Sequence, residues 1–431
     1  MVSRCPQPTT RQCEARSGAA RAARNDGWSW GRGRLGTLLA AAWLAGCATE
    51  SFDRPGAGNE AAYAAAHPYY AEFCALSQIK KKPGFGADIR GEIGGHAVFY
   101  LNGACRVEAA HYPVLRVCDP TDGVGLSMNE HFENAKWVAT PGRDFFFHGN
   151  LAPSAPVTRD TYAAVQAEAK RLGVYDGVRF HPVVFRDMPP GWAARDWMYE
   201  VSVATDYAIS LGRGRFCARI PVDRAAMGRM VDFLNAENAP YRSGAAVFRW
   251  SVFRDNCIHL AHNALAAAGL WDRWPTHRPL LVSVFDFPVP KNEFVNVMRR
   301  ANDELPLRPA DLDPAARRAL LAHGTLPTQP GALAEARPPQ RPNDVYDTDL
   351  KLIFYDEPNF GRYQERFDAI FREPRYLDAR ANLEHFRSLY AGIEEARVQT
   401  GTGTDAAFYG YVAAQRAAVE AELAPGGPVT R

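Results

Sequence analysis

The chain has 431 residues, of which 47% are hydrophobic and 11% aromatic, enough apolar material for a sizeable globular core. Its 50 Lys and Arg stand against 48 Asp and Glu, but residues 1–46 hold seven of the basic residues and two of the acidic ones. Residues 47–431 therefore carry 43 basic and 46 acidic residues, a net charge of −3. Without a basic surplus, nucleic acid is not an expected partner.

Residues 1–46 have the layout of a secretory signal. An Arg-rich segment is followed by an apolar stretch, 35–43, which is too short to span a bilayer. The stretch ends in Leu44-Ala45-Gly46-Cys47, which resembles the lipobox of bacterial lipoproteins. In that motif the cysteine becomes the lipidated first residue, so we expect residues 1–46 to be a signal peptide and Cys47 to carry the membrane anchor.

The residues after the lipobox indicate where the anchored protein resides. Ala48 follows the cysteine, in place of the Asp that often retains such lipoproteins in the inner membrane. We therefore expect a lipid-anchored protein of the cell envelope, at the outer membrane rather than the inner one. Residues 47–69 are rich in Ala and Gly and are interpreted as a tether.

Residues 70–302 mix strand and helix patterns, which predicts an α+β domain. Alternating apolar residues indicate strands, whereas apolar spacing with capping residues indicates helices. Gly269 stands where a glycine commonly ends a helix. The expected strands are 96–101, 114–117, 136–139 and 248–253, and the expected helices are 159–172, 222–236 and 255–268.

The last part of the chain divides into two segments. Residues 303–345 hold many prolines and few aromatic residues, which indicates a linker or an extended strap, with a short helix starting at Asp313-Pro314. Residues 346–431 regain an amphipathic pattern and are expected to be helical. The helices expected there are 362–372, 377–397 and one that starts after Asp405 and ends near Leu423.

Five cysteines remain once Cys5 and Cys13 leave with the signal peptide and Cys47 is lipidated. The cell envelope favours disulfides, and an odd number leaves one thiol over. Cys105 and Cys118 flank a predicted hairpin and are proposed as one pair, with Cys74 and Cys217 as the second. The remaining thiol is then Cys257.

Two short segments carry the candidate chemistry. His96 follows Gly94-Gly95 at the start of an apolar strand, and Cys257 follows Asp255-Asn256 where a helix is expected to begin. The N–H groups and the dipole of a helix N-terminus favour a thiolate, and a nearby imidazole would make that thiol nucleophilic.

Together these motifs resemble the circularly permuted branch of the NlpC/P60 papain-like superfamily, in which the histidine precedes the cysteine. Asn256-Cys257-Ile258-His259 fits the Asn-Cys-x-His motif of its lecithin-retinol-acyltransferase-like members. The resemblance implies an antiparallel sheet with helices, Cys257 as nucleophile and His96 as general base. It places the third, orienting polar residue at Glu108 or slightly later at His111.

The distance between the two motifs implies a large insertion between about 120 and 245. The expected fold class is thus α+β, a permuted papain-like core with this insertion and a helical C-terminal extension. Asp206, within the insertion, would lie near the site only if the insertion folds back.

Each residue also has a purely structural interpretation. Cys257 could be a small core residue, because free cysteine is often buried, and His96 could be a hydrogen-bonded core histidine. Glu108 and His111 could face solvent. His259 and His262 could form a polar rim or a helix surface; with Cys257 they cannot all face one ion well, so neither a metal nor another cofactor is expected.

Two functions follow from these alternatives. The first is an envelope-anchored cysteine hydrolase or acyltransferase that acts on an amide or ester, with cell-wall peptide (peptidoglycan) favoured over acyl lipid as substrate. The second is a non-catalytic envelope lipoprotein that uses the same scaffold for binding or assembly.

Overall fold

The computed structural model describes most of the chain after the tether. The described residues are 51–52, 54, 60–86, 95–271, 273–276, 278–285, 288–302, 330–348, 350–354, 356, 362–400 and 406–424. They belong to one compact unit, Thr49–Arg431. The signal peptide, the lipobox with Cys47, the short helix expected at Asp313 and the cap at Asp405 lie outside the described residues.

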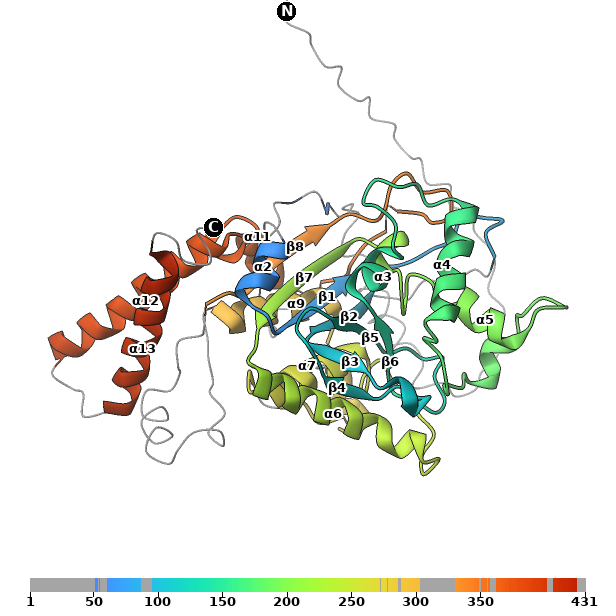
Figure 1. Cartoon of the computed structure of the whole chain (residues 1–431), viewed down its shortest axis with the longest axis horizontal. Coiled ribbons are helices and arrows are strands. Elements are labelled where there is room, and N and C mark those ends of the chain that lie inside the picture. Colours follow the sequence, from blue (N-terminus) through green and yellow to red (C-terminus); the bar gives the residue numbers. More distant parts are fainter. Residues whose placement is uncertain are drawn as a thin grey trace, which may run out of the picture. The chain divides into compact units, whose positions relative to one another are not determined.

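A six-stranded antiparallel sheet forms the centre of the fold (Figure 1). Its strand order is β6-β5-β2-β1-β7-β8, so the two central strands come from the N-terminal half of the unit. A two-stranded ribbon, β3-β4, follows β2 in the chain. The strands are β1 Tyr70–Leu76, β2 His96–Asn102, β3 Ala104–Arg106, β4 Leu115–Val117, β5 Gly123–Ser127, β6 Val138–Pro141, β7 Arg215–Pro221 and β8 Leu333–Arg337.

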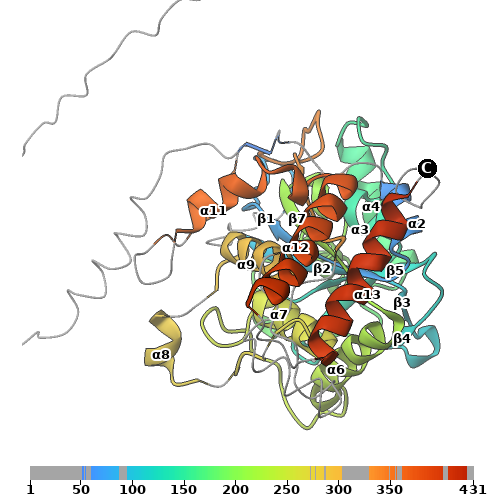
Figure 2. The same cartoon turned by 90° about the vertical axis from the view of Figure 1, so that its left-hand side faces the viewer.

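Helices complete an α+β architecture. Helix α7 packs against β2 and α6, and α9 packs against β1 and β7, while α12 and α13 pair with each other (Figure 2). The described helices are α2 Glu60–Ala66, α3 Arg143–His148, α4 Arg159–Arg171, α5 Ala194–Glu200, α6 Arg224–Arg242, α7 Cys257–Ala268, α8 Leu280–Phe285, α9 Pro290–Asn302, α11 Tyr363–Ile370, α12 Ala379–Thr400 and α13 Ala406–Leu423.

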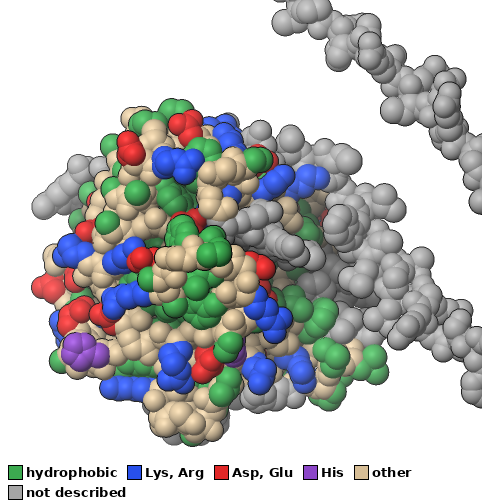
Figure 3. All heavy atoms as spheres, turned by 90° about the vertical axis from the view of Figure 1, so that its right-hand side faces the viewer, with side chains coloured by type: hydrophobic (Ala, Val, Ile, Leu, Met, Phe, Trp, Pro, Cys, Tyr) green, Lys and Arg blue, Asp and Glu red, His purple; other side chains and the backbone are tan. Residues whose placement is uncertain are grey.

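None of the helices in the described part of the chain is long and apolar enough to cross a bilayer. The face drawn in Figure 3 carries acidic and basic side chains interspersed with each other. This distribution agrees with the near-balanced charge of the sequence.

The two faces of the central strand β1 differ in chemistry, because successive side chains of a strand point to opposite faces. Phe73 and Ala75 join the large core to which α7 and α9 also contribute. The alternate residues Glu72 and Cys74 point to the other face, where Cys74 lies in a smaller cluster with residues of α3. One face of the sheet therefore supports the helices by apolar packing, and the other holds charges and a disulfide.

A buried ion cluster occupies that second face. Arg219 of β7 lies 2.9 Å from Glu335 of β8 and 3.6 Å from Glu72 of β1, and these three residues are almost fully buried. Arg143 of α3 lies 2.9 Å from the other oxygen of Glu72. Burial alone would lower the pKa of Arg219, but the surrounding carboxylates outweigh it and raise the pKa.

The expected cysteine pairing is confirmed. Cys74 and Cys217 stand directly opposite each other on β1 and β7 and form a disulfide. Cys105 and Cys118 form the second disulfide across the β3-β4 ribbon. Cys257 is not in a disulfide and is buried.

Most expected helices are present, but one of the four expected strands is absent. The prediction of a strand at 248–253 is wrong: Ser251 and Asp255 exchange backbone hydrogen bonds in a tight turn that leads into α7. β1, β3, β5 and β7, in contrast, are strands where the sequence predicted none. The segment expected as a linker or strap supplies β8, an edge strand of the sheet.

We predict that the two disulfides contribute unequally to stability. Cross-linking a longer segment removes more entropy from the unfolded chain, and the separations are 143 and 13 residues. The chain-entropy relation gives about 5 kcal/mol for the longer loop and about 3 kcal/mol for the shorter one. Urea unfolding should therefore show a larger loss for Cys74→Ala/Cys217→Ala than for the matched control Cys105→Ala/Cys118→Ala. Equal losses, or the reverse order, would contradict the entropic account.

Candidate active site

A side-chain cap fixes the start of α7. The carboxamide oxygen of Asn256 accepts hydrogen bonds from the backbone N–H groups of Ile258 at 2.9 Å and His259 at 3.2 Å. The His259 ring in turn accepts from the backbone N–H of Asn256 at 3.4 Å, which completes a capping box. Cys257 is thereby the first residue of α7, and 8% of its surface is exposed.

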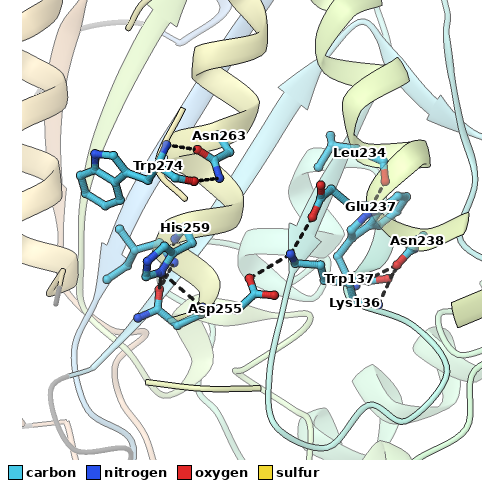
Figure 4. A network of polar contacts seen from close by, with 11 residues as sticks. Lys136, Trp137, Leu234, Glu237, Asn238, Asp255, His259, Asn263 and Trp274 are labelled. Carbon is cyan, nitrogen blue, oxygen red and sulfur yellow. Dashed lines mark hydrogen bonds and ion pairs between the residues drawn. The ribbon is translucent and has the colours of Figure 1, made fainter. Parts of the chain in front are cut away.

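An ion triplet lies just ahead of Cys257. Lys136 Nζ lies 2.9 Å from Asp255 Oδ1 and 2.6 Å from Glu237 Oε2, as Figure 4 shows. Burial disfavours the charge of Lys136, but the two carboxylates outweigh it, so its pKa is raised. Lys136 is therefore a fixed ammonium group rather than a base.

His96, the first residue of β2, is held by a chain of polar side chains. Its Nε2 lies 3.1 Å from Ser127 Oγ, and that hydroxyl lies 2.6 Å from Asp206 Oδ1. The Asp206 carboxylate also accepts hydrogen bonds from Asn129 and Tyr175. All five side chains are buried.

This chain of hydrogen bonds selects one tautomer of His96. The Ser127 hydroxyl has one hydrogen, and both of its other partners, the Asp206 carboxylate and the Thr205 carbonyl, are acceptors. The Ser127 oxygen therefore accepts a hydrogen bond from His96 Nε2–H. In the neutral ring, Nδ1 is then the basic nitrogen.

The starts of β2 and α7 lie at the same end of the sheet. β2 and β5 are antiparallel, so β2 starts where β5 ends, at Ser127, opposite the start of β6 at Val138. Lys136, just ahead of β6, pairs with Asp255, just ahead of α7. α7 also packs against β2, so the two sequence motifs stand at the starts of two packed elements.

Glu108 and His111 lie on an exposed 3-10 turn, Glu108–Ala110, between β3 and β4. β3 ends at Arg106, ahead of both residues. Their orienting role stays a prediction, while Ser127 and Asp206 are the polar partners that the structure places beside His96. Sequence reasoning missed Ser127, although the apolar alternation of Val124 and Leu126 was a signal for the strand that holds it.

His259 and His262 are buried, so their interpretation as a polar rim or helix surface is corrected. His262 Nδ1 lies 2.8 Å from Glu293 Oε1 of α9. The His262 ring is stacked between Trp271 and Trp274, with ring centroids 4.2 and 3.7 Å away. His262 thus connects α7 to α9, whereas His259 caps the start of α7 itself.

An open cleft adjoins the ion triplet. Its lining combines a carboxylate, two guanidinium groups and two aromatic rings. The lining residues are Phe233, Glu237, Asn263, Arg273, Trp274, Pro275, Thr276 and Arg278.

Potential metal ligands cluster at two places in the described part of the chain. Glu72 lies with Cys74 and Cys217, and Asp122 with Cys105 and Cys118. All four cysteines are in disulfides, so neither group offers a thiolate to an ion.

No family model matches this chain, and neither a curated protein nor a solved structure does.

We predict that His259 makes the protein less stable on acidification. Burial, reinforced by the charge of Lys136, lowers its pKa to about 4. As the pH falls below the unfolded value of about 6.5, the unfolded chain takes up a proton that the folded state does not bind until about pH 4, so stability falls through that window. Between pH 7 and 5 this one group contributes a loss of about 2 kcal/mol.

Urea unfolding at the two pH values tests this. His259→Gln, which keeps a capping side chain, should show a loss on acidification smaller by that amount. His111→Gln, at an exposed position, is the matched control. An unchanged pH dependence in His259→Gln would refute the assignment.

Proposed function

We propose that this chain is an envelope-anchored cysteine hydrolase or acyltransferase with a permuted papain-like core of the NlpC/P60 type. Its substrate is an amide or ester, with cell-wall peptide favoured over acyl lipid, and lipid on Cys47 anchors it in the outer membrane. One observation carries the proposal: Cys257 starts α7 at the end of the sheet where His96, oriented by Ser127, starts β2.

The environment of each histidine favours His96 as the base. His259 is closer in sequence to Cys257, but burial lowers its pKa to about 4, so it is a poor imidazolium partner for a thiolate at neutral pH. Its Nδ1 is also occupied by the cap of α7. His96 has its Nε2 bound to Ser127, whose hydroxyl is held in turn by the Asp206 carboxylate, so the ring is oriented by polar side chains.

In the proposed reaction, His96 Nδ1 accepts the proton of the Cys257 thiol, and the sulfur attacks the substrate carbonyl carbon. The backbone N–H of Cys257 is the proposed donor to the negative oxygen of the tetrahedral intermediate, because the N–H groups of Ile258 and His259 donate to the Asn256 side chain. The intermediate collapses as the leaving amine or alcohol departs with the proton from His96, which leaves a thioester on Cys257. Water, or an acceptor hydroxyl or amine, then gives its proton to His96 and breaks the thioester.

The alternative, a non-catalytic envelope lipoprotein, is favoured by two observations. The side chains of Cys257 and His96 are both buried, as structural residues would be. Helices α12 and α13 pack around a small core of their own, which contains Phe386, Tyr390 and Val412. In this alternative, the helical pair is the binding surface.

The first prediction from the proposal concerns thiol reactivity. Iodoacetamide alkylation of Cys257, followed across pH by mass spectrometry, should show an apparent pKa well below the free-thiol value of about 8.5. His96→Gln should raise that apparent pKa, and Cys257→Ala should abolish hydrolysis of cell-wall peptides and acyl esters while leaving the unfolding curve intact.

His262→Gln is the matched control, because His262 lies on the same helix but is bonded to Glu293. It should leave the reactivity of Cys257 unchanged. A Cys257 that reacts only in the unfolded chain would favour the non-catalytic alternative.

The second prediction concerns orientation of the base. Ser127→Ala removes the acceptor of His96 Nε2–H, so the apparent pKa of Cys257 should move toward that of His96→Gln, and activity should fall. Thr140→Val is the matched control: Thr140 is also a buried hydroxyl bound to Asp206, but through the Asp206 backbone carbonyl. Equal effects of the two substitutions would show that Ser127 acts only through stability.

A further inference from the structure

Helix α8 exposes a run of large apolar side chains. Leu280, Leu281 and Val282 are 51%, 75% and 49% exposed and consecutive in the chain. The other large hydrophobic residues found exposed in the described part of the chain, Val183, Trp192 and Val247, are scattered. An apolar cluster in contact with water marks an interaction site more often than single exposed residues do.

The position of α8 makes this run accessible. Figure 2 shows α8 at the periphery, clear of the neighbouring helices. In the space-filling view from the opposite side, hydrophobic side chains project at the corresponding edge of the molecule (Figure 3).

The segment that leads to α8 is fastened to α7. Trp271 Nε1–H donates to the His262 carbonyl at 2.8 Å. The backbone N–H of Trp274 donates to Asn263 Oδ1 at 2.7 Å, and the Asn263 amide donates to the Trp274 carbonyl at 3.0 Å (Figure 4). The exposed helix is therefore attached to the element that carries Cys257.

We propose that α8 is a membrane-docking element whose aliphatic side chains insert into the surface of a lipid bilayer. Arg273 and Arg278 precede it, and cationic residues close to an apolar run are typical of segments at the membrane interface. The two arginines also complement anionic lipid headgroups.

Two considerations favour a bilayer over a protein partner. A stable protein interface usually buries about 800 Å² on each side, more than one six-residue projecting helix supplies, whereas a bilayer accepts a small convex apolar projection. A lipid on Cys47 would also hold α8 at high local concentration near the membrane. Docking by α8 is separate from catalysis by Cys257 and is testable without activity.

The test reads the environment of residue 281 in the full chain. Leu281→Cys is introduced in a background in which Cys5, Cys13, Cys47 and Cys257 are replaced by Ser, so that the polarity-sensitive dye NBD labels residue 281 alone. The labelled chain is mixed with vesicles of phosphatidylethanolamine and phosphatidylglycerol. Val183→Cys, at a position 53% exposed, is labelled as the matched control. Label at 281 should gain several-fold in emission, shift to the blue, and be quenched by lipids that carry a doxyl group on the acyl chain.

The control label at 183 should show none of these changes. Absence of a response at 281, or equal responses at 281 and 183, would overturn membrane docking by α8. A response at 281 to envelope proteins but not to vesicles would also overturn it. Because the labelled chain lacks the Cys257 thiol, these outcomes are independent of whether the proposed catalysis is correct.

Discussion

The buried pairing of Glu72 with Arg219 is the interaction on which the arrangement of this fold most depends. It connects β1 to β7, and further ion pairs extend from both residues. Arg219 also pairs with Glu335 of β8, and Glu72 also pairs with Arg143 of α3. Glu60 of α2 pairs with both arginines. Leaving one such charge unpaired in the interior costs about 3–5 kcal/mol, far more than a surface pair is worth. The cluster therefore favours the observed strand neighbours more by penalising wrong pairings than by adding net stability.

Placing the charges on one face of β1 leaves the other face for helix packing. There Phe73 and Ala75 share a core with α7, so the position of α7 on the sheet is set by apolar contact. Polar groups of the candidate site then gather at the end of the sheet, where β2 starts and β5 ends. Buried polar groups there form two sets of hydrogen bonds: His96 of β2 with Ser127 of β5 and Asp206, and Asn256 with His259 at the start of α7.

The sequence predicted best the features that depend on residues close together in the chain. Helix α7 was predictable because Asn256 caps its start and Gly269, with a φ of 103°, ends it. The disulfide pairing was predictable because five cysteines leave one thiol over and because Cys105 and Cys118 flank a predicted hairpin. Strand β8 is an edge strand set by register with β7, which no local pattern in a proline-rich segment reveals. Ser127 and Asp206 are 79 residues apart, so their pairing depends on how the segment between them folds back.

His259 and His96 differ in their polar surroundings, and this difference underlies their proposed roles. Burial lowers the pKa of His259, and the charge of Lys136 reinforces the effect, so the ring is neutral at neutral pH. His259 Nδ1 lies 3.4 Å from the Asn256 backbone N and 3.0 Å from its carboxamide oxygen, so the ring serves the cap of α7. Around His96 the chain of polar side chains runs through the Ser127 hydroxyl to the Asp206 carboxylate and orients the ring through Nε2. A capping histidine and a base can therefore coexist within one small region of the fold.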